Sequence, residues 1–293
     1  MRWLYHLAPR GQASPTHPAP DGFIHASFRD ELLASARLHF PAGADLVALP
    51  IDPRRLDVRV ELADTPRGPM PHIHGPVARD AVGAPIELDA IGAAPDRVTG
   101  TRFAFVVFED LTLLDLVGAL DPLSRIASMG FDPTSTVTIV SATGPRVWSQ
   151  GGAALTVDEA RPALDAFDVV VVPGGHGTRA LEADAGALAW IAAYPHNRLL
   201  ASVCTGALLL GAAGRLRGRR ATTHHRELGR LAAFGATAVE ARVVDAWPIV
   251  TAGGVTSALD LGLYLVRWLE GAEVAAAIAR QMQMPEGWDS GAR

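Results

Sequence analysis

The spacing of hydrophobic residues changes character near residue 98. Before this point the hydrophobic runs are short and are separated by segments rich in Pro and His; they predict brief strands at Trp3–Leu7, Leu46–Ile51 and Val58–Leu62. Residues 91–100 mix small residues with Pro and Gly, a composition typical of a linker. We therefore predict a small α+β domain over 1–90, a linker over 91–100 and a second domain over 101–293.

From residue 101 onward, hydrophobic runs alternate with helical patterns. Phe103–Phe108 is continuously hydrophobic, as a strand buried on both faces should be. Further buried strands are predicted at Val137–Ser141, Val169–Val172, Leu199–Val203 and Ile249–Thr251. Helical patterns lie between them, at Leu116–Met129, Thr178–Ala193, Gly206–Ala213, Arg226–Phe234 and Ser257–Leu269. This alternation predicts an α/β fold with a mainly parallel sheet that helices cover on both faces.

One strand end carries a candidate nucleophile. In parallel sheets of this kind, ligands bind beyond the carboxyl ends of the strands. Leu199–Val203 runs directly into Cys204 and Thr205, and a helix follows, as in the serine elbow of hydrolases. The positive end of the helix favours a thiolate at this position. Cysteine is also a common buried apolar residue, so residues at the neighbouring strand ends are needed to distinguish a reactive thiol from a core residue.

Two other strand ends carry matching chemistry. Val169–Val172 leads into Gly174 and Gly175, whose backbone amides, with that of Thr205, are candidates for an oxyanion hole. After the first strand, Asp115 opens a hydrophobic helix near the same edge of the sheet. A carboxyl group beside a thiol holds or donates a proton if burial raises its pKa. The alternative for Asp115 is a helix N-cap.

Two further motifs have weaker links to chemistry. His224 and His225 follow an Arg-rich turn, and either is a candidate supporting base, although both suit a helix cap equally well. Residues 175–180 formally match a dinucleotide-binding glycine fingerprint. Because the next strand ends in a cysteine rather than an acidic residue, we reject the dinucleotide interpretation.

Composition excludes several kinds of chemistry. All 26 positive side chains are arginine, so neither a Schiff-base lysine nor a Walker A lysine is present. Cys204 is the only cysteine, which excludes an intrachain disulfide and a cysteine-based zinc site. The net charge is −5 and the charged residues are scattered along the chain without a basic stripe, so we expect no nucleic-acid partner. With no signal peptide and no hydrophobic stretch of spanning length, we expect no membrane partner and a cytoplasmic location.

The large domain resembles a known family in three motifs. These are SVCTGALLLGAAGRLRGRRATTHH at 202–225, VVVVPGGHGT at 169–178 and VTAGGVTSALDLGL at 250–263. Together they are similar to the isonitrile hydratase branch of the ThiJ/PfpI superfamily, over about 102–284. The resemblance implies a flavodoxin-like parallel-sheet sandwich, akin to class I glutamine amidotransferases, that forms a homodimer. It implies neither a cofactor nor a metal.

Carried onto this sequence, the resemblance implies Cys204 as nucleophile, Asp115 as the essential acid and Thr205 as a supporting hydroxyl. The implied reaction, that of a hydro-lyase, adds water to a small-molecule isonitrile and gives an N-substituted formamide. Two departures bear on the substrate: His225 replaces the usual tryptophan, and Thr205 stands where protease-like members have histidine. Alternatives are glyoxalase- or deglycase-type chemistry on reactive carbonyls, and a non-enzymatic cysteine redox or ligand sensor. A chain ending near residue 293 leads us to expect no transcriptional control.

The small domain carries six of the ten histidines. Its Gly-Phe-Ile-His-x-Ser and Pro-His-Ile-x-Gly-Pro strings resemble a bacterial family, domain of unknown function 952, whose fold is thought akin to ADP-ribosyltransferases. We expect a polar cleft formed by His6, His25, Glu61 and His72. A metal site, a nucleotide pocket and histidines bonded within the fold all remain open interpretations.

Overall fold

The computed structural model describes residues 2–11, 18–96, 98–285 and 288. The chain divides into two compact units, Met1–Val98 and Thr99–Arg293. Within the described ranges, no helix is long and apolar enough to cross a membrane. The cytoplasmic location stays a prediction.

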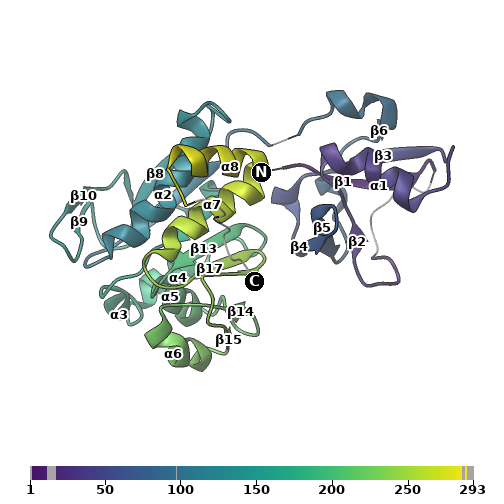
Figure 1. The fold of residues 1–293 in the computed structure, drawn as a ribbon. Coiled ribbons are helices and arrows are strands. Elements are labelled where there is room, and N and C mark those ends of the chain that lie inside the picture. Colours follow the sequence, from purple (N-terminus) through teal and green to yellow (C-terminus); the bar gives the residue numbers. More distant parts are fainter. Residues whose placement is uncertain (1, 12–17, 97, 286–287, 289–293) are drawn as a thin grey trace. The chain divides into compact units, whose positions relative to one another are not determined.

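A seven-stranded sheet forms the centre of the large unit (Figure 1), in the order β11-β8-β7-β12-β13-β17-β16. Neighbouring strands are parallel, except that β16 runs antiparallel to β17. The strands are β7 (Arg102–Val107), β8 (Thr136–Ser141), β11 (Glu159–Ala160), β12 (Val169–Val172), β13 (Leu199–Val203), β16 (Val243–Ala246) and β17 (Ile249–Ala252). The residues of β12, β13 and β17 are all buried, which confirms the predicted two-sided burial.

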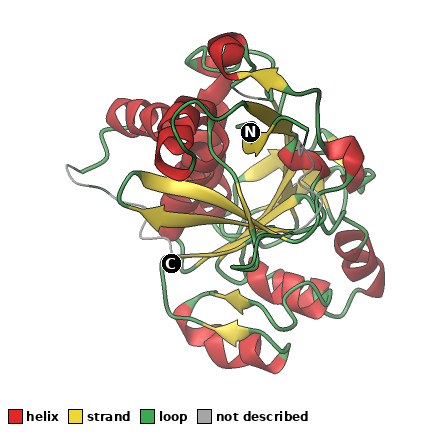
Figure 2. Cartoon of the chain, turned by 90° about the vertical axis from the view of Figure 1, so that its right-hand side faces the viewer, coloured by secondary structure: helices red, strands yellow, loops and turns green. Residues whose placement is uncertain are grey.

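Helices cover both faces of this sheet (Figures 1 and 2). One group packs together as α2 (Leu113–Ser128), α7 (Ser257–Glu270) and α8 (Ala272–Gln281). The other contains α3 (Thr178–Leu181), α4 (Ala185–Ala192) and α5 (Gly206–Ala212), with α6 (Leu228–Ala233) packed on α5. Helices α2 and α7 approach closely at small residues, since a Cβ at Gly118 would lie 2.7 Å from the Cβ of Ala258. This contact fixes α2, and with it Asp115, against the sheet.

Some helices differ from the sequence prediction. The predicted helix Thr178–Ala193 is broken into α3 and α4, because the Asp184 carboxylate caps α4 by accepting hydrogen bonds from the backbone N–H groups of Gly186 and Ala187. Helix α8 was not predicted. Two short pairs, β9 (Arg146–Trp148) with β10 (Ala154–Thr156) and β14 (Arg220–Ala221) with β15 (Thr237–Ala238), lie outside the central sheet.

The small unit contains two three-stranded sheets and helix α1 (Leu32–His39). One sheet has the order β1-β3-β6 and the other β2-β5-β4. Their strands are β1 (Leu4–Pro9), β2 (Ile24–His25), β3 (Leu46–Ile51), β4 (Arg59–Thr65), β5 (Gly68–His74) and β6 (Ile86–Glu87). A bridge between Tyr5 and Ser27 joins the sheets. This α+β arrangement contains all three predicted strands; the likeness to ADP-ribosyltransferases stays a prediction.

Most of the predicted linker 91–100 belongs to the small unit. Ile91 and Ala94 are 4% and 7% exposed and pack in the same core as Tyr5 and Leu32. The Tyr5 hydroxyl donates to the Pro95 carbonyl, and the Trp3 N–H donates to the Asp96 carbonyl at 3.1 Å. Small residues and proline therefore form part of a packed edge here, and the division between the units, at 98/99, falls inside the predicted linker.

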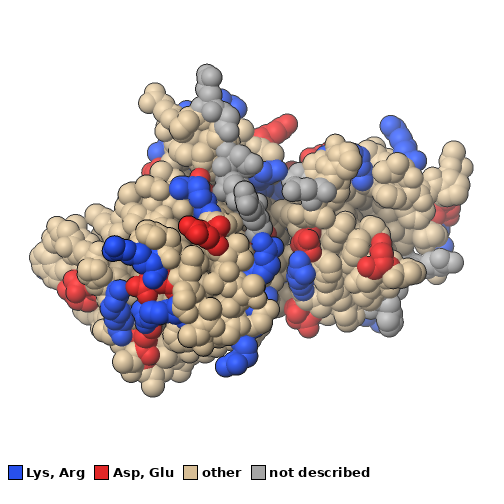
Figure 3. All heavy atoms as spheres, turned by 60° about the horizontal axis from the view of Figure 1, so that its bottom comes forward, with Lys and Arg blue, Asp and Glu red and all other residues tan. Residues whose placement is uncertain are grey.

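Charged side chains on the face shown in Figure 3 are mixed in sign. Opposite charges also pair within the large unit, as in Arg179–Glu227 and Arg230–Glu227, each at 3.1 Å. Exposed pairs of this kind contribute little to stability, but they neutralise one another locally. The expected absence of a nucleic-acid partner stays a prediction.

Candidate active site

The candidate site lies where the chain reverses direction in the sheet. From β7 the chain proceeds to β8 on one side and later returns to β12 on the other side of β7. Such a switch point opens a crevice beyond the carboxyl ends of the strands. Asp115, Gly174 and Cys204 follow β7, β12 and β13, which are neighbours in the sheet.

Cys204 occupies a strained turn between β13 and α5. Its φ of +56° lies in the left-handed region, which is uncommon for a residue with a side chain. Its N–H donates to the carbonyls of Ala252 (3.0 Å) and Gly253 (2.8 Å), and its carbonyl accepts from the Thr223 hydroxyl at 2.7 Å. These bonds hold the strained backbone, and the side chain is 6% exposed.

Two glycines allow the turn to pack against the end of β12. A Cβ at Gly206 would lie 2.2 Å from the carbonyl oxygen of Val172. At Gly174, it would lie 2.6 Å from the backbone nitrogen of Thr205 and 2.8 Å from Oδ2 of Asp115. The two strand ends therefore approach each other only because these positions have no side chain.

Asp115 is a buried carboxyl group in the first turn of α2. The preceding Thr112 occupies the N-cap position, so Asp115 is not the cap. Its Oδ2 accepts a hydrogen bond from the Gly174 N–H at 3.0 Å, and its Oδ1 is buried without a hydrogen-bond partner of ordinary geometry among the described residues. Burial raises the pKa of Asp115 to about 7, although the Gly174 N–H and the Cys204 thiol oppose the rise.

The thiol of Cys204 interacts with the Asp115 carboxyl group. Burial and then the charge of Asp115 raise the pKa of Cys204 to about 12, while the Thr205 N–H and hydroxyl act against the rise. The expectation that the helix N-terminus favours the thiolate is therefore not met. Desolvation of the thiol and the neighbouring Asp115 carboxylate raise its pKa instead.

The oxyanion-hole prediction does not fit the hydrogen bonds of the turn. The Gly174 N–H donates to Asp115, and the Gly175 N–H donates to Oγ1 of Thr205 at 2.9 Å. The Thr205 hydroxyl in turn donates to the Gly175 carbonyl at 3.1 Å. Both glycine amides are thus occupied in positioning the acid and the Thr205 side chain, and the Thr205 N–H is directed at the Cys204 sulfur.

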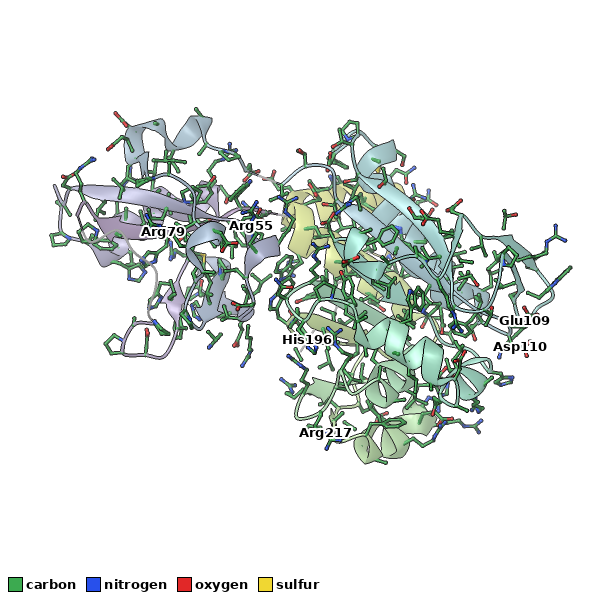
Figure 4. All side chains as sticks on the ribbon, turned by 180° about the vertical axis from the view of Figure 1, so that it is seen from behind. Arg55, Arg79, Glu109, Asp110, His196 and Arg217 are labelled. Carbon is green, nitrogen blue, oxygen red and sulfur yellow. The ribbon has the colours of Figure 1, made fainter. Side chains whose placement is uncertain are left out.

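The glycines after β12 also pack against the loop that follows β7. This loop contains Glu109 and Asp110 (Figure 4), and Glu109 Oε2 accepts a hydrogen bond from the Trp148 N–H at 3.0 Å. A Cβ at Gly177 would lie 1.8 Å from the Glu109 carbonyl oxygen. The glycines at 175 and 177 therefore allow close packing against this loop.

His224 caps the short 3-10 helix His225–Glu227, because its Nδ1 accepts a hydrogen bond from the Arg226 N–H at 3.3 Å. Burial and the neighbouring His225 and Arg226 lower the pKa of His224. Its catalytic support role stays a prediction. Sequence reasoning missed Thr223, which holds the Cys204 carbonyl; its position in the threonine–histidine run was the available signal.

A cavity of about 320 Å³ lies beside the backbone of the turn between β13 and α5. Thr223 and Gly253, which are hydrogen-bonded to the backbone of Cys204, line this cavity together with His225 and Arg242. His225, the position where the family resemblance expected tryptophan, thus faces a cavity next to the candidate nucleophile.

In the small unit, three of the four predicted cleft residues line one cavity. His6, His25 and His72 border a space of about 570 Å³. Glu61 is absent from its lining and instead pairs with Arg59 at 2.5 Å and His74 at 3.1 Å. Among the residues that the structure describes, no group of three or more His, Cys, Asp or Glu side chains is arranged to hold a metal ion.

The fold and the site define a class: an α/β protein with a flavodoxin-like sheet and a buried cysteine on the turn after a central strand. Residues 101–267 match the model of the DJ-1/PfpI family, and the chain belongs to that family. Residues 5–84 match the family described as a protein of unknown function, DUF952. Both assignments confirm the resemblances seen in the sequence.

Several known proteins are similar to the large unit. Isonitrile hydratase of Pseudomonas putida is 35% identical over 185 residues, which cover 62% of this chain and 78% of that protein. The crystal structure of a ThiJ/PfpI family protein from Pseudomonas syringae has a TM-score of 0.56 and 32% identity, covering 67% of this chain and 80% of that one. The HTH-type transcriptional regulator GbdR of Pseudomonas aeruginosa is 28% identical over 193 residues, 65% of this chain and 52% of the regulator.

Proposed function

We propose that the large unit catalyses the cysteine-dependent hydration of a small isonitrile to an N-substituted formamide. The observation that carries this proposal is the contact between the Cys204 thiol and the buried carboxyl group of Asp115, whose pKa burial raises to about 7. The similarity to isonitrile hydratase supports the reaction class. A general acid is most effective when its pKa lies near the working pH, as burial provides at Asp115.

Access to the pair favours a narrow substrate. Cys204 is 6% exposed and Asp115 is fully buried, so only a slim group reaches both. The reactive carbon of an isonitrile is the unsubstituted end of a linear group. It therefore suits this approach better than a peptide carbonyl, which is flanked by chain on both sides.

In the first step, Sγ of Cys204 bonds to the terminal carbon of R–N≡C. Asp115 gives its proton to that carbon and takes the thiol proton in exchange. The carbon–nitrogen triple bond becomes a double bond, and the product is the thioimidate R–N=CH–S–Cys204. The carboxyl group ends the step neutral, as it began.

In the second step, water adds to the thioimidate carbon. Asp115 protonates the nitrogen and accepts a proton from the water, which gives R–NH–CH(OH)–S–Cys204. The carbon–sulfur bond then breaks, and the hydroxyl proton passes to the sulfur through Asp115. The products are R–NH–CHO and the free thiol, so the net reaction consumes one water and no cofactor.

We also propose that the chain forms a homodimer through the large unit. Leu114 and Val117 are 42% and 39% exposed on adjacent turns of α2, and Trp148 on β9 is 47% exposed. A contiguous patch of exposed large apolar side chains often marks an interface. Light scattering of wild type and Leu114→Asp tests this; a monomeric wild type overturns it.

The hydratase is tested by measuring formamide production from an alkyl isonitrile. The variants are Cys204→Ala, Asp115→Asn and the matched control Asp121→Asn, which makes the same change on α2 at a carboxylate that is 45% exposed and pairs with Arg125. We expect loss of turnover of at least about a thousandfold in the first two variants and none in the control. Folded wild-type protein without turnover overturns the assignment.

The same proteins distinguish the alternatives. Turnover of methylglyoxal that depends on Cys204 would indicate carbonyl chemistry. Reversible oxidation of Cys204 without turnover on either compound would indicate a sensor, a role that regulators such as GbdR make reasonable for this domain.

A further inference from the structure

The small unit contains a pocket that the chemistry at Cys204 does not use. Its volume is about 570 Å³, within the usual range for small-molecule sites. Four segments enclose it: β1, residues 25–27 at the end of β2, helix α1 with the residue that follows it, and the β4–β5 turn with the adjoining part of β5. All of its lining residues lie between Tyr5 and His72, so the small unit forms the pocket by itself.

One part of the pocket wall is apolar. It consists of Leu7, Leu38, Phe40 and Met70. Leu38 is 65% exposed on α1, which is unusual for a large apolar side chain. A ligand body that is aromatic or otherwise apolar would cover this surface and gain the free energy of burying it.

A fixed cation faces the same space. The Arg67 backbone N–H donates to the Thr65 hydroxyl at 3.2 Å, and its Nη1 donates to the Ser35 hydroxyl at 3.0 Å. Ser27, 5% exposed, donates to Ser35 at 2.8 Å and so supports that hydroxyl from behind. The nearest described carboxylate oxygen, Oε2 of Glu31, lies 3.9 Å from Nη1 of Arg67. A guanidinium has five N–H donors in a planar fork, and this half-buried one keeps several for an oxyanion.

Hydrogen bonds fix the orientation of two histidine rings at the pocket. His6 Nδ1 lies 2.8 Å from the His25 carbonyl oxygen. Since a carbonyl only accepts, His6 is protonated at Nδ1, and its neutral ring presents an acceptor at Nε2. His25 Nε2 lies 2.7 Å from Asp21 Oδ2, and by the same reasoning this nitrogen bears the N–H that donates to the carboxylate. Phe23 stacks on His72 with ring centroids 3.9 Å apart.

We propose that this pocket binds a small organic anion with an aromatic or apolar body. The oxyanion pairs with Arg67, the body lies against Leu38, Phe40 and Met70, and His6 Nε2 accepts a hydrogen bond from a donor on the ligand. Carboxylates and phosphates share this chemistry.

The test compares three probes of one shape with the full-length protein: 2-naphthoate, 2-naphthyl phosphate and the neutral 2-naphthamide. Binding is measured by titration calorimetry or by ligand-detected NMR. We expect at least one anion to bind about tenfold more tightly than the amide. Tighter binding of the phosphate or of the carboxylate shows which of these two anionic groups the pocket prefers.

Variants connect the charge preference to this pocket. Arg67→Gln should reduce anion binding to the level of the amide, whereas Arg79→Gln, the same change at an exposed arginine of the small unit (Figure 4), should leave it unchanged. Because Leu38 is exposed, Leu38→Asp should fold and repel the anions but not the amide; Leu38→Asn is its neutral control.

Three outcomes overturn the proposal: equal binding of amide and anions, anion binding that survives Arg67→Gln and Leu38→Asp, and no binding of any probe at millimolar concentration. Cys204→Ala should bind the probes as wild type does. A failure of isonitrile hydration therefore leaves this proposal standing, and its own failure leaves the hydratase proposal untouched.

Discussion

The two candidate sites of this chain are built in opposite ways. In the large unit, a thiol and a carboxyl group are buried in mutual contact, and the adjoining Gly174 and Gly175 N–H groups and the Cys204 carbonyl are hydrogen-bonded. In the small unit, polar side chains are spread around a cavity of about 570 Å³ that also has an apolar wall. The first arrangement suits the making and breaking of bonds, because it fixes a few atoms closely; the second suits the binding of a ligand through many contacts.

The difference has an energetic consequence. At Cys204 a strained backbone, two close glycines and a desolvated carboxyl group depend on one another. One substitution there affects several of these features together. In the pocket of the small unit each contact is separate, so single substitutions should cause graded losses.

Outside the Cys204–Asp115 pair itself, the largest expected effect is that of Gly174→Ala. Its Cβ would meet Oγ1 of Thr205 at 2.7 Å and Oδ2 of Asp115 at 2.8 Å, so the acid and the turn have to separate. We expect at least about a hundredfold loss of isonitrile turnover, together with a stability loss of about 1–3 kcal/mol. Product assays and thermal melting measure the two effects.

Gly144→Ala is the matched control. No heavy atom lies within 4 Å of the Cβ that this change would add, so turnover and melting should stay close to wild type. If Gly174→Ala behaved like Gly144→Ala, the close packing of the candidate site would not be required, and the contrast between the two sites would be lost.

The sequence predicted the framework of the large unit well. The bounds of β12 and β13 match the predicted runs to the residue, because continuous Val, Leu and Ala stretches suit strands buried on both faces. The strand-end rule also brought Asp115 and Cys204 together correctly, since β7 and β13 flank β12.

The electrostatics of the site could not be predicted in the same way. A cysteine at a helix N-terminus indicates a lowered pKa, but the opposite direction results from the depth of burial and from contact with a residue 89 positions earlier in the chain. Likewise, Ile91 and Ala94 resemble linker residues in sequence, and only the packed core of the small unit reveals their burial.

The second prediction concerns pH. In the proposed mechanism Asp115 acts as a proton carrier in its neutral form, and burial raises its pKa to about 7. Activity should therefore be highest below this pKa and fall about tenfold per unit as the pH rises above it. The kcat/KM for the isonitrile between pH 5.5 and 9 is the measurement.

The same shift has a consequence for stability. Because the folded-state pKa is raised, the favourable contribution of the neutral carboxyl group is complete at low pH and is lost as the pH rises through about 7. Asp115→Asn should weaken the pH dependence of melting in this range.

For the kinetic prediction, a kcat/KM that stays level or increases up to pH 9 would contradict the role of the neutral acid.

A smaller effect is expected from Thr205→Val. The Thr205 hydroxyl accepts from the Gly175 N–H at 2.9 Å, so valine leaves this buried donor unpaired, whereas the Gly175 carbonyl keeps its hydrogen bond from the Thr178 hydroxyl. We expect a loss of about 1–3 kcal/mol in stability and about tenfold in turnover. Thr205→Ser keeps the hydroxyl and should retain most of both; equal losses in the two variants would assign the effect to the methyl group instead.

The smallest expected effect belongs to the small unit and tests its separable contacts. Adding a hydroxyl group to the probe, as 6-hydroxy-2-naphthoate, offers a donor to His6 Nε2, which is an acceptor because Nδ1 is bonded to the His25 carbonyl. One such hydrogen bond contributes about 1 kcal/mol, and so about a fivefold gain in affinity over 2-naphthoate. His6→Phe should remove this gain while leaving the affinity for 2-naphthoate nearly unchanged, because the charge contact with Arg67 is separate. A gain that persists in His6→Phe would place the hydroxyl elsewhere, and a loss of all binding would mean that this pocket is as interdependent as the site around Cys204.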